Sequence, residues 1–266
     1  MSDIHATAVI DGAAELGEGV RIGPYCSVGP EVRIGDGVVL DSHAVIAGKT
    51  RIGANTRIFP FASIGTQPQD MKYHGEPSEL VIGCNNIIRE YVTMNPGTEG
   101  GGMRTEIGNN CLFMVGSHVA HDCRIGDHVI LVNNATLGGH VTLEEWVIVG
   151  GMSAVHQFVR IGRHAMVGGM TGVENDVIPY GSVTGNRARL QGLNIVGLKR
   201  RGFGRDQIHE LRNAYRLLFA PEGTMLERLE DVAKLFAGNE SVMEIVRFIR
   251  ADSSRAICQP LLEDAA

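Results

Sequence analysis

The segment VAHDCRIGDHVILVNNATLGGHVTLEEWVIVGGMSAVHQFVRIGRHAMV, residues 119–167, decides the fold because an aliphatic residue recurs at every sixth position. The recurring residues are Val119, Ile125, Leu131, Leu137, Leu143, Val149, Val155, Ile161 and Val167. A period of six fits neither the α-helical period nor the alternation of a flat strand. It predicts a parallel β-helix of hexapeptide repeats, in which each hexad forms one side of a triangular prism. Three hexads complete one coil, so residues separated by three hexads stack on one another.

This stacking gathers histidines on one edge of the predicted prism. His121, Gly139 and Gln157 share one column, Asp122, His140 and Phe158 share the next, and Ala120, Gly138 and His156 share a third, with His118 just before them. A histidine is a suitable general base near neutral pH. Asp122 would orient the ring of His121, and the backbone N–H of Gly139 would stabilise a developing oxyanion. His128 and His164 lie outside these columns, and we expect them to be solvated surface residues.

The same repeat begins at Ile4, runs in phase to Ile64 and resumes from Ile107 to Val173. We therefore expect a β-helix over residues 1–185. Two polar, glycine- and proline-containing segments near residues 65–80 and 95–106 interrupt the repeat and are predicted to be loops. Loops on a solenoid commonly mark its functional face, which makes Asp70 and Lys72 candidate substrate contacts.

A helical period replaces the repeat in the last part of the chain. Apolar residues three and four positions apart, from Ile208 to Ile249, predict amphipathic helices. We expect a C-terminal helical domain over residues 189–266. A basic run, Lys199, Arg200, Arg201 and Arg205, opens this domain. It is either a solvated helix face or an attractive surface for an acidic partner or a phosphate.

Composition restricts the class of protein. The 266 residues carry a formal net charge of −6, which argues against non-specific nucleic-acid binding. The five cysteines form no CxxC pair, and Cys26, Cys111 and Cys123 occupy small core positions of the repeat, so we expect free buried thiols.

No apolar run approaches the roughly 20 residues of a membrane span and no signal-peptide pattern opens the sequence, so a cytoplasmic location is expected. Many of the 35 glycines follow an aliphatic repeat position, where we expect sharp corners.

Four segments resemble the UDP-N-acetylglucosamine O-acyltransferase family, and the similarity extends over nearly the whole chain. They are SHVAHDC (117–123), NNATLGGHV (133–141), GGMSAVHQF (150–158) and GLNIVGLKRRGF (192–203). The resemblance implies a left-handed β-helix that assembles as a homotrimer, with active sites between subunits. It implies transfer of an (R)-3-hydroxyacyl group from acyl carrier protein to the 3-hydroxyl of UDP-N-acetylglucosamine, the first step of lipid A synthesis. It implies no metal and no cofactor.

The resemblance also implies roles for individual residues. His121 would be the general base, Asp122 its partner, and Gly139 the donor to the oxyanion. The residues that would position donor and sugar are His118, His140, His156 and Gln157. Asp70 and Lys72 would contact the sugar nucleotide across the subunit interface, and Asn194, Arg200 and Arg201 would lie near the nucleotide. Gly169 would occupy the position that limits acyl length, and its missing side chain would favour a longer acyl group.

Two departures from the family pattern leave alternatives open. Asn95 and Pro96 stand where familiar members carry a His-Arg pair, and Val196 stands where they carry a glutamate. One alternative is an N-acyltransferase that acts on a 3-amino UDP-sugar. The clustered histidines leave a separate alternative, a trimeric hydratase that uses them as zinc ligands, which would require three nitrogen ligands in a roughly tetrahedral arrangement.

Overall fold

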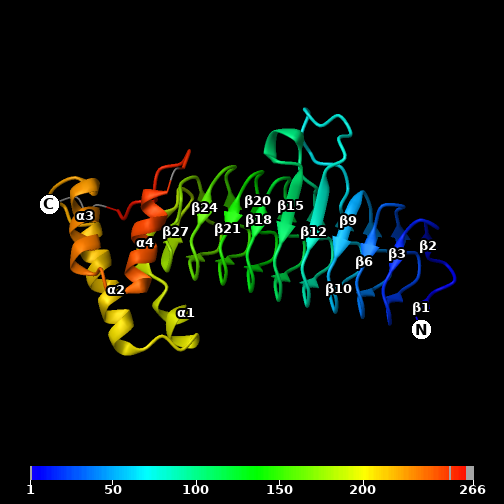
Figure 1. Cartoon of the computed structure of the whole chain (residues 1–266), viewed down its shortest axis with the longest axis horizontal. Helices are drawn as coiled ribbons and strands as arrows, with labels where there is room; N and C mark the ends of the chain where they lie inside the picture. The colour runs from blue at the N-terminus through cyan, green and yellow to red at the C-terminus, as the bar shows by residue number, and fades with distance from the viewer. Residues whose placement is uncertain (1, 252, 262–266) are drawn as a thin grey trace.

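The computed structural model describes residues 2–251 and 253–261 and shows a long prism followed by a group of helices (Figure 1). The prism is a left-handed β-helix, and three parallel sheets form its sides. Within the described residues, sheet A contains β1 (Asp3–Ile4), β4 (Arg21–Ile22), β7 (Val39–Leu40), β10 (Arg57–Ile58), β13 (Ile87–Ile88), β16 (Leu112–Phe113), β19 (Ile130–Leu131), β22 (Ile148–Val149), β25 (Met166–Val167), β27 (Gly181–Thr184) and β28 (Arg189–Leu193). Sheet B contains β2 (Val9–Ile10), β5 (Ser27–Val28), β8 (Val45–Ile46), β11 (Ser63–Ile64), β14 (Thr93–Met94), β17 (His118–Val119), β20 (Thr136–Leu137), β23 (Ala154–Val155) and β26 (Gly172–Val173). Sheet C contains β3 (Glu15–Leu16), β6 (Arg33–Ile34), β9 (Lys49–Ile52), β12 (Glu79–Ile82), β15 (Arg104–Ile107), β18 (Arg124–Ile125), β21 (Thr142–Leu143) and β24 (Arg160–Ile161).

The predicted register is confirmed. Val119 pairs with Leu137, and Leu137 pairs with Val155, in parallel strands of successive coils. These residues are at most 3% exposed, because the second residue of each two-residue strand points into the prism. The aliphatic repeat therefore forms one continuous core along the prism axis.

Three columns of corner residues join the sheets. The B–C corner includes Asp122, His140 and Phe158, the C–A corner includes His128, Trp146, His164 and Tyr180, and the A–B corner includes Tyr25, His43, Phe61, Tyr91, Asn134, Met152 and Met170. All of these residues have a left-handed backbone, with φ between 56° and 66°.

The glycines that follow the aliphatic positions lie at the corners, as expected, but non-glycine residues occupy many of the left-handed corner positions. Gly35 and Gly53 do not have positive φ; a Cβ on Gly35 would come within 2.9 Å of the Ala54 nitrogen, and a Cβ on Gly53 within 2.5 Å of the Gly83 carbonyl carbon. Such glycines are required because successive coils approach each other closely.

Both predicted loops leave the prism at the B–C corner. One connects β11 to β12 across residues 65–78, and the other connects β14 to β15 across residues 95–103 and contains the short 3₁₀ helix η1 (Glu99–Gly101). Figure 1 shows them projecting together from one edge of the prism. Asp122 is at the same corner in the next coil, so the interruptions of the repeat surround the predicted site.

The C-terminal part begins with a strand and continues as helices. The expected boundary near residues 185–189 falls between β27 and β28, which pair antiparallel, so β28 extends sheet A. The helices are α1 (Ile195–Arg200), α2 (Arg205–Leu218), α3 (Met225–Leu235) and α4 (Glu240–Arg250). The apolar faces of α2, α3 and α4 are buried together, as the helical period predicts. None of the helices in the described residues has the length and apolar character needed to cross a membrane.

After α4 the chain returns to the prism. Ile257 forms a bridge with Asp176, and Pro260 forms one with Leu190. The Asp176 side chain is buried and accepts hydrogen bonds from Arg160 and Ser253. Residues 262–266 of the expected helical domain lie outside the described residues.

Candidate active site

His121 and Asp122 form a hydrogen-bonded pair at the B–C corner. Nδ1 of His121 lies 2.7 Å from Oδ2 of Asp122, and the Asp122 carboxylate is fully shielded from solvent. An ionised carboxylate only accepts hydrogen bonds, so Nδ1 carries the proton and Nε2 keeps a free lone pair. The pair has the arrangement required for a general base and the group that orients it.

Gly139 lies directly against the ring of His121. A Cβ at Gly139 would come within 2.7 Å of Nε2, so a side chain at this position would collide with the base. The thiol of Cys123 donates to the carbonyl oxygen of Gly138 at 3.2 Å. Since the N–H and C=O of a trans peptide point in opposite directions, the Gly139 N–H is directed away from the core. A backbone donor beside the base is the element an oxyanion site requires.

His140 and His118 flank this pair. The ring of His140 meets His121 edge-on at 5.1 Å and stacks on Phe158 at 4.3 Å. Burial lowers the pKa of His140, an effect that the nearby Asp122 carboxylate opposes. Burial, together with the neighbouring His121, also lowers the pKa of His118, whose Nδ1 lies 2.7 Å from the Thr93 hydroxyl. Both rings are therefore neutral near pH 7 and can donate or accept hydrogen bonds with a substrate.

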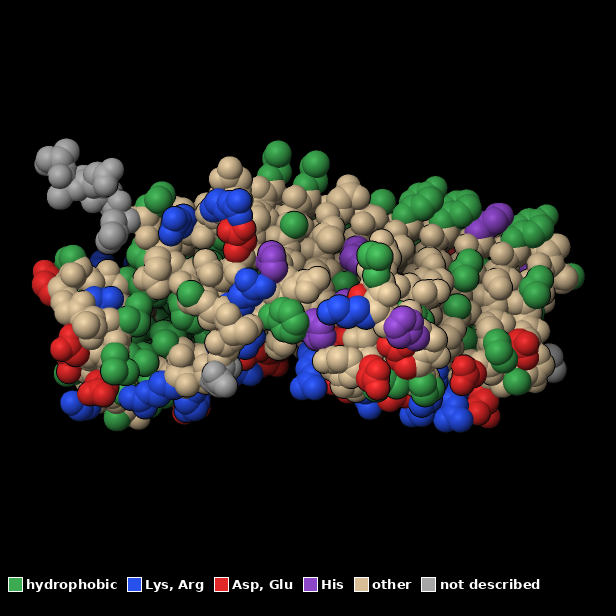
Figure 2. All heavy atoms as spheres, turned by 90° about the horizontal axis from the view of Figure 1, so that it is seen from above, with side chains coloured by type: hydrophobic (Ala, Val, Ile, Leu, Met, Phe, Trp, Pro, Cys, Tyr) green, Lys and Arg blue, Asp and Glu red, His purple; other side chains and the backbone are tan. Residues whose placement is uncertain are grey.

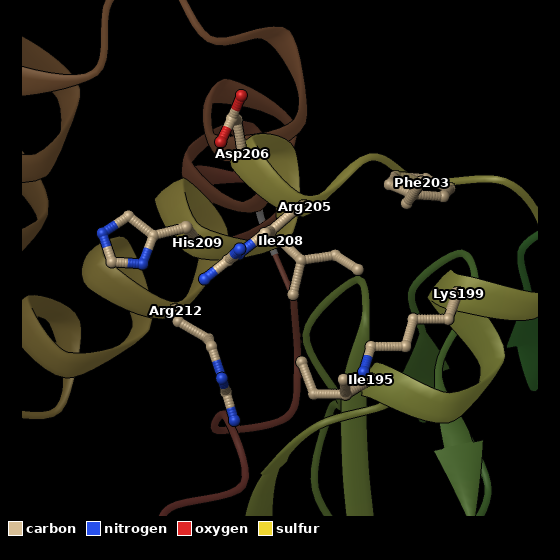
Figure 3. A pocket seen from close by; sticks show the side chains of 8 residues that line it. All are labelled: Ile195, Lys199, Phe203, Arg205, Asp206, Ile208, His209 and Arg212. Atoms are coloured by element: carbon tan, nitrogen blue, oxygen red, sulfur yellow. The ribbon is translucent and has the colours of Figure 1, made fainter.

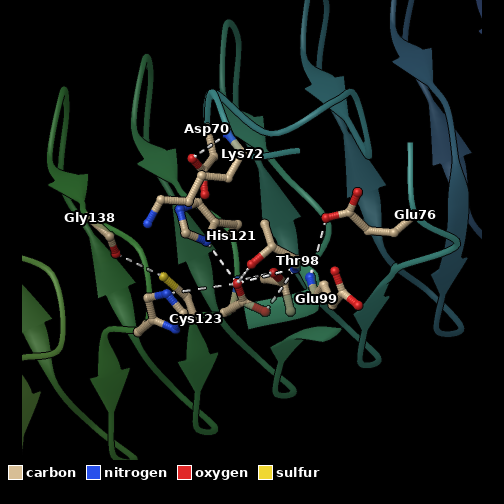
Figure 4. Close-up of polar contacts among 11 residues, drawn as sticks. Asp70, Lys72, Glu76, Thr98, Glu99, His121, Cys123 and Gly138 are labelled. Atoms are coloured by element: carbon tan, nitrogen blue, oxygen red, sulfur yellow. Dashed lines mark hydrogen bonds and ion pairs between the residues drawn. The ribbon is translucent and has the colours of Figure 1, made fainter. Parts of the chain in front are cut away.

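The first loop brings Asp70 and Lys72 to this cluster. Figure 4 shows both side chains beside His121, and the Asp70 carboxylate acts electrostatically on His140. The Lys72 N–H donates to the Asp70 carboxylate at 3.0 Å. Within one chain, these two residues and the histidines therefore surround the same space.

His156 and Gln157 occupy the same edge one coil further along. A C-terminal residue that the sequence analysis missed, Arg255, contacts both: its guanidinium lies 2.7 Å from Nδ1 of His156 and donates to the Gln157 carbonyl oxygen at 3.1 Å. Because a guanidinium can only donate, Nδ1 of His156 is the acceptor and its Nε2 carries the proton. No spacing in the sequence connects residue 255 to residue 156.

The predicted nucleotide contacts lie at a different corner. Asn194 caps α1, since it accepts from Gly197 N–H at 3.0 Å, and it also donates to the His164 carbonyl oxygen at 2.9 Å. Arg201 donates to the Trp146 carbonyl oxygen at 3.1 Å, and Arg200 on the same helix is exposed. His164 and Trp146 belong to the C–A corner, so one side of the prism separates these residues from His121.

Gly169 also lies apart from His121 in a single chain. It is exposed and precedes Met170 at the A–B corner. A Cβ on Gly169 would meet the Gly151 oxygen at 3.4 Å, an ordinary contact, so this corner has room for a side chain.

The departures Asn95 and Val196 have different surroundings. Asn95 is 3% exposed, and its amide donates to the carbonyl oxygens of Thr66 and Gln67 at 2.9 and 3.2 Å, which ties the two loops together. Pro96 beside it is also buried. Val196 is 62% exposed on α1.

The expectation that His164 is a solvated surface residue is wrong. His164 is only 9% exposed, stacks between Trp146 and Tyr180, and meets Phe203 edge-on. Burial, helped by Arg201 and Arg163, lowers its pKa to about 4. The aromatic residues that enclose it come from neighbouring coils and from the tail, which the hexad pattern does not reveal. His128 stacks on Trp146 at 4.0 Å and is partly buried.

The sequence analysis also missed a residue of the second loop. Thr98 donates to the Asp122 carboxylate from its backbone N–H at 3.0 Å and from its hydroxyl at 2.6 Å (Figure 4). The two hydrogen bonds connect residues 24 positions apart, a spacing that no repeat predicts because the loop breaks the count.

His121, Asp122 and His140 could together offer ligand atoms to a metal ion. Ligand atoms of His121, Asp122 and His140 lie within 4.8 Å of one another. However, Oδ2 of Asp122, the oxygen that faces both rings, already accepts from the Thr98 hydroxyl and from Nδ1 of His121, so a cation bound to this oxygen would have to displace these hydrogen bonds. The arrangement fits a proton-transferring pair better than a structural zinc site, which is closed by four ligands.

The prism is built from hexapeptide coils, and its loop-lined edge carries a His-Asp pair beside a corner glycine. These features together define a hexapeptide transferase. The model of the bacterial transferase hexapeptide family matches residues 13–48 and 104–139, and the model described as UDP N-acetylglucosamine O-acyltransferase, domain 2, matches residues 176–258. The chain belongs to the UDP-N-acetylglucosamine O-acyltransferase family and is an acyltransferase.

Full-length relatives support this assignment. The acyl-[acyl-carrier-protein]–UDP-N-acetylglucosamine O-acyltransferase of Caulobacter vibrioides is 55% identical over 97% of this chain and 98% of its own length. The protein of the same name from Rhizobium johnstonii is 50% identical over 97% of this chain and 94% of its own length. A crystal structure of a UDP-N-acetylglucosamine acyltransferase superposes with a TM-score of 0.93 at 44% identity. The superposed region covers 97% of this chain and 99% of the chain in that crystal structure.

Proposed function

We propose that this chain transfers an (R)-3-hydroxyacyl group from acyl carrier protein to the 3-position of UDP-N-acetylglucosamine, the reaction that begins lipid A synthesis. One observation carries the chemical part: the free Nε2 of His121 and the backbone of Gly139 lie side by side, with Nδ1 of His121 bonded to a buried carboxylate. The names of the relatives support the choice of substrates.

In the proposed mechanism, Nε2 of His121 removes the proton from the sugar hydroxyl as its oxygen attacks the thioester carbonyl. The new C–O bond produces a tetrahedral oxyanion, and the Gly139 N–H donates to it. The C–S bond then breaks, and the imidazolium returns its proton to the departing thiolate of the carrier. Asp122 stabilises the imidazolium between these two steps. His118, His140, His156 and Gln157 position the substrates, and the charged Asp70 and Lys72 contact the sugar nucleotide from above the base.

A homotrimer is proposed from the distribution of outward-facing side chains. The outer positions of sheet A in its middle strands are apolar: Ile87, Leu112, Ile130, Ile148 and Met166. The A–B corner adds exposed Tyr25, Phe61, Tyr91, Met152 and Met170, and Figure 2 shows hydrophobic side chains in a row along one long edge. Sheet C, by contrast, carries an exposed charged ladder that includes Glu15, Arg33 and Arg51. Apolar patches of this extent favour burial against another subunit, whereas sheet C suits solvent.

The same distribution gives the trimer a geometry. If three A–B corners meet at a common axis, sheet A of one subunit packs on sheet B of the next. The C–A corner of the first subunit, with Asn194, Arg200 and Arg201, then lies beside the B–C corner of the second, with His121. This arrangement brings together residues that a single chain keeps apart. It also places Asp70 and Lys72 at the interface.

The acyl carrier protein is proposed to dock on the first two helices. A cavity of about 790 Å³ between α1 and α2 is lined by Ile195, Lys199, Phe203, Arg205, Asp206, Ile208, His209 and Arg212 (Figure 3). Four of these residues are basic types and one is acidic. A positive surface around an apolar floor suits an acidic protein whose apolar residues enter the cavity.

The 3-hydroxyl is proposed as the acceptor because neither departure from the family pattern places new chemistry at the base. The Asn95 amide is engaged by loop carbonyls. Val196 is on α1, which the proposed trimer brings toward His121 of the next subunit, but its side chain is apolar and adds no ionisable or hydrogen-bonding group there. The alternative, a 3-amino UDP-sugar, would use the same base and the same oxyanion donor.

A long acyl group is proposed because Gly169 leaves its corner open. A cytoplasmic location, expected from the sequence, stays a prediction.

Mass spectrometry tests the proposal. Purified protein is incubated with a panel of 3-hydroxyacyl and unsubstituted acyl carrier protein thioesters and with either the 3-hydroxy or the 3-amino UDP-sugar. The expected product is the O-acyl ester of a long 3-hydroxyacyl chain, and an amide formed at the higher kcat/KM would support the N-acyltransferase alternative. For the hydratase alternative, elemental analysis should find stoichiometric zinc, with loss of activity on chelation.

A further inference from the structure

The Asp122 carboxylate is held by more than the histidine it orients. Its side chain is completely shielded from water, so every stabilising contact must come from the protein. The Thr98 N–H donates to Oδ1 at 3.0 Å, and the Thr98 hydroxyl donates to Oδ2 at 2.6 Å. Oδ2 also accepts from His121 at 2.7 Å. The Thr98 hydroxyl and the base therefore share one carboxylate oxygen.

The second loop is built to keep Thr98 in this position. The Thr98 carbonyl oxygen accepts from Gly101 N–H at 3.1 Å and from Met103 N–H at 2.9 Å. Thr98 is the N-cap residue of η1, yet its hydroxyl makes no capping hydrogen bond and is directed to Asp122 instead. Gly101 approaches so closely that a Cβ would lie 1.9 Å from Cγ of Asp122. The backbone of Asp122 is fixed separately, since its N–H donates to the Thr105 hydroxyl at 2.8 Å.

We infer that Thr98 is a positioning residue of the acyl transfer, which fixes the rotamer and the charge of Asp122 and through them the tautomer and basicity of His121. This inference rests on the proposed role of His121 as the base. Burial raises the pKa of the Asp122 carboxyl, but the hydrogen bonds from His121 and Thr98 outweigh this effect and its pKa lies below the ordinary value. Thr98 itself is 5% exposed and acts through Asp122.

The hydroxyl also moderates the base. As long as it donates to Oδ2, it withdraws part of the negative charge that Nδ1–H of His121 would otherwise meet. Without it, the carboxylate attracts the imidazolium more strongly, and the imidazolium gives up its proton less readily. Loss of the hydroxyl is therefore expected to move the acidic limb of the pH profile of kcat/KM to higher pH, in addition to loosening Asp122.

The test compares Thr98→Val, which keeps the shape and removes the donor, with Thr98→Ser, which keeps the donor. Hydrogen bonds to buried charged groups are strong enough that we expect kcat of Thr98→Val to fall by about ten- to a hundredfold. KM for both substrates should stay within about twofold of wild type, and the acidic limb of the pH profile of kcat/KM should move to higher pH. Thr98→Ser should retain kcat within about threefold and keep the wild-type profile.

Several results would overturn the inference. They are a Thr98→Val enzyme with wild-type kcat, one whose activity falls equally at every pH, and a Thr98→Ser enzyme as impaired as Thr98→Val. Should Thr98→Val not fold, Thr98→Ala, which removes the same donor without adding bulk, is measured in its place. His121→Ala is assayed in parallel: if it remains active, the base assignment fails, whereas a dead His121→Ala with an unaffected Thr98→Val removes only the role of Thr98.

Discussion

The imidazole of His121 rests on the backbone of Gly139, one coil away, so closely that a Cβ at Gly139 would lie 2.5 Å from Cε1 of the ring. The contact fixes the base from one side, while the hydrogen bond to Asp122 fixes it from the other. A residue without a side chain is therefore required at this corner for a local reason. The same glycine supplies the N–H that the proposed mechanism directs at the oxyanion.

Gly139→Ala should displace the ring of His121 and disturb the oxyanion donor. Loss of one oxyanion donor costs about 10²–10³ in kcat, and we expect a reduction of this order with little change in KM. Steady-state kinetics on the purified variant measure it. The control is Gly12→Ala, at the B–C edge of the first coil, where a Cβ meets nothing within 4 Å. If Gly139→Ala were as active as Gly12→Ala, the packing of the base on Gly139 would have no catalytic importance.

Asn194, Arg200 and Arg201 lie at another corner from His121, and the proposed trimer brings these two sets of residues together between subunits. Co-expression of His121→Ala with the Arg200→Ala/Arg201→Ala double variant should therefore restore activity. In random trimers about a quarter of the interfaces combine two intact halves, so about a quarter of wild-type kcat per site is expected. Each variant alone provides the baseline. Mixed trimers no more active than that baseline would show that one chain supplies both halves.

The basic cavity between α1 and α2 should affect the carrier protein and leave the sugar nucleotide unaffected. Arg212→Glu is expected to raise KM for the acyl carrier protein thioester by about tenfold or more at low salt, and to leave KM for the UDP-sugar unchanged. Arg216→Glu is the matched control, since it reverses the same charge one turn along α2, outside the cavity. Equal effects of the two variants would mean that overall charge, and not this cavity, attracts the carrier.

His164 should make the fold less stable in acid. Its pKa falls from 6.5 in the unfolded chain to about 4 in the folded one, so only the unfolded chain takes up a proton as pH decreases through this range. The stability lost is on the order of 3 kcal/mol once pH falls below both values. His164→Phe keeps the stack with Trp146 and Tyr180 but does not titrate, so its unfolding free energy should fall less between about pH 7.5 and 5. Urea unfolding at one fixed protein concentration measures the difference. Parallel pH dependence of wild type and variant would contradict the assignment.

The hexad period was sufficient to predict the prism, its register and the edge that holds His121, Asp122, Gly139 and His140. Register follows from a fixed count, so residues in unbroken coils can be placed from their numbers alone. The same count fails for Thr98 and Arg255, which reach the site from a loop and from the C-terminal segment. It also failed for His164, because Phe203 and Arg201, from the tail, help to enclose that side chain. Contacts made by irregular segments depend on tertiary packing, and no local pattern encodes them.

The glycines show a second limit of the pattern. Glycines were expected at sharp corners, and they do follow the aliphatic positions there, yet the left-handed position itself is held with full side chains by residues such as Tyr25, Asp122 and Trp146. The surrounding coils fix the conformation at each corner and offset its local cost. The sequence correctly marks the corners, while the physical reason for the glycines is the close stacking of coils, as at Gly35 and Gly53.

The most direct test of the account is the rate of acyl transfer by His121→Ala. If Nε2 of His121 removes the proton from the acceptor, kcat/KM for the UDP-sugar should fall by about 10²–10⁴ while the fold is retained. His5→Ala, an exposed histidine of the first coil, should behave like wild type. A folded His121→Ala protein that loses less than about tenfold in kcat/KM would contradict the assignment of His121 as the general base.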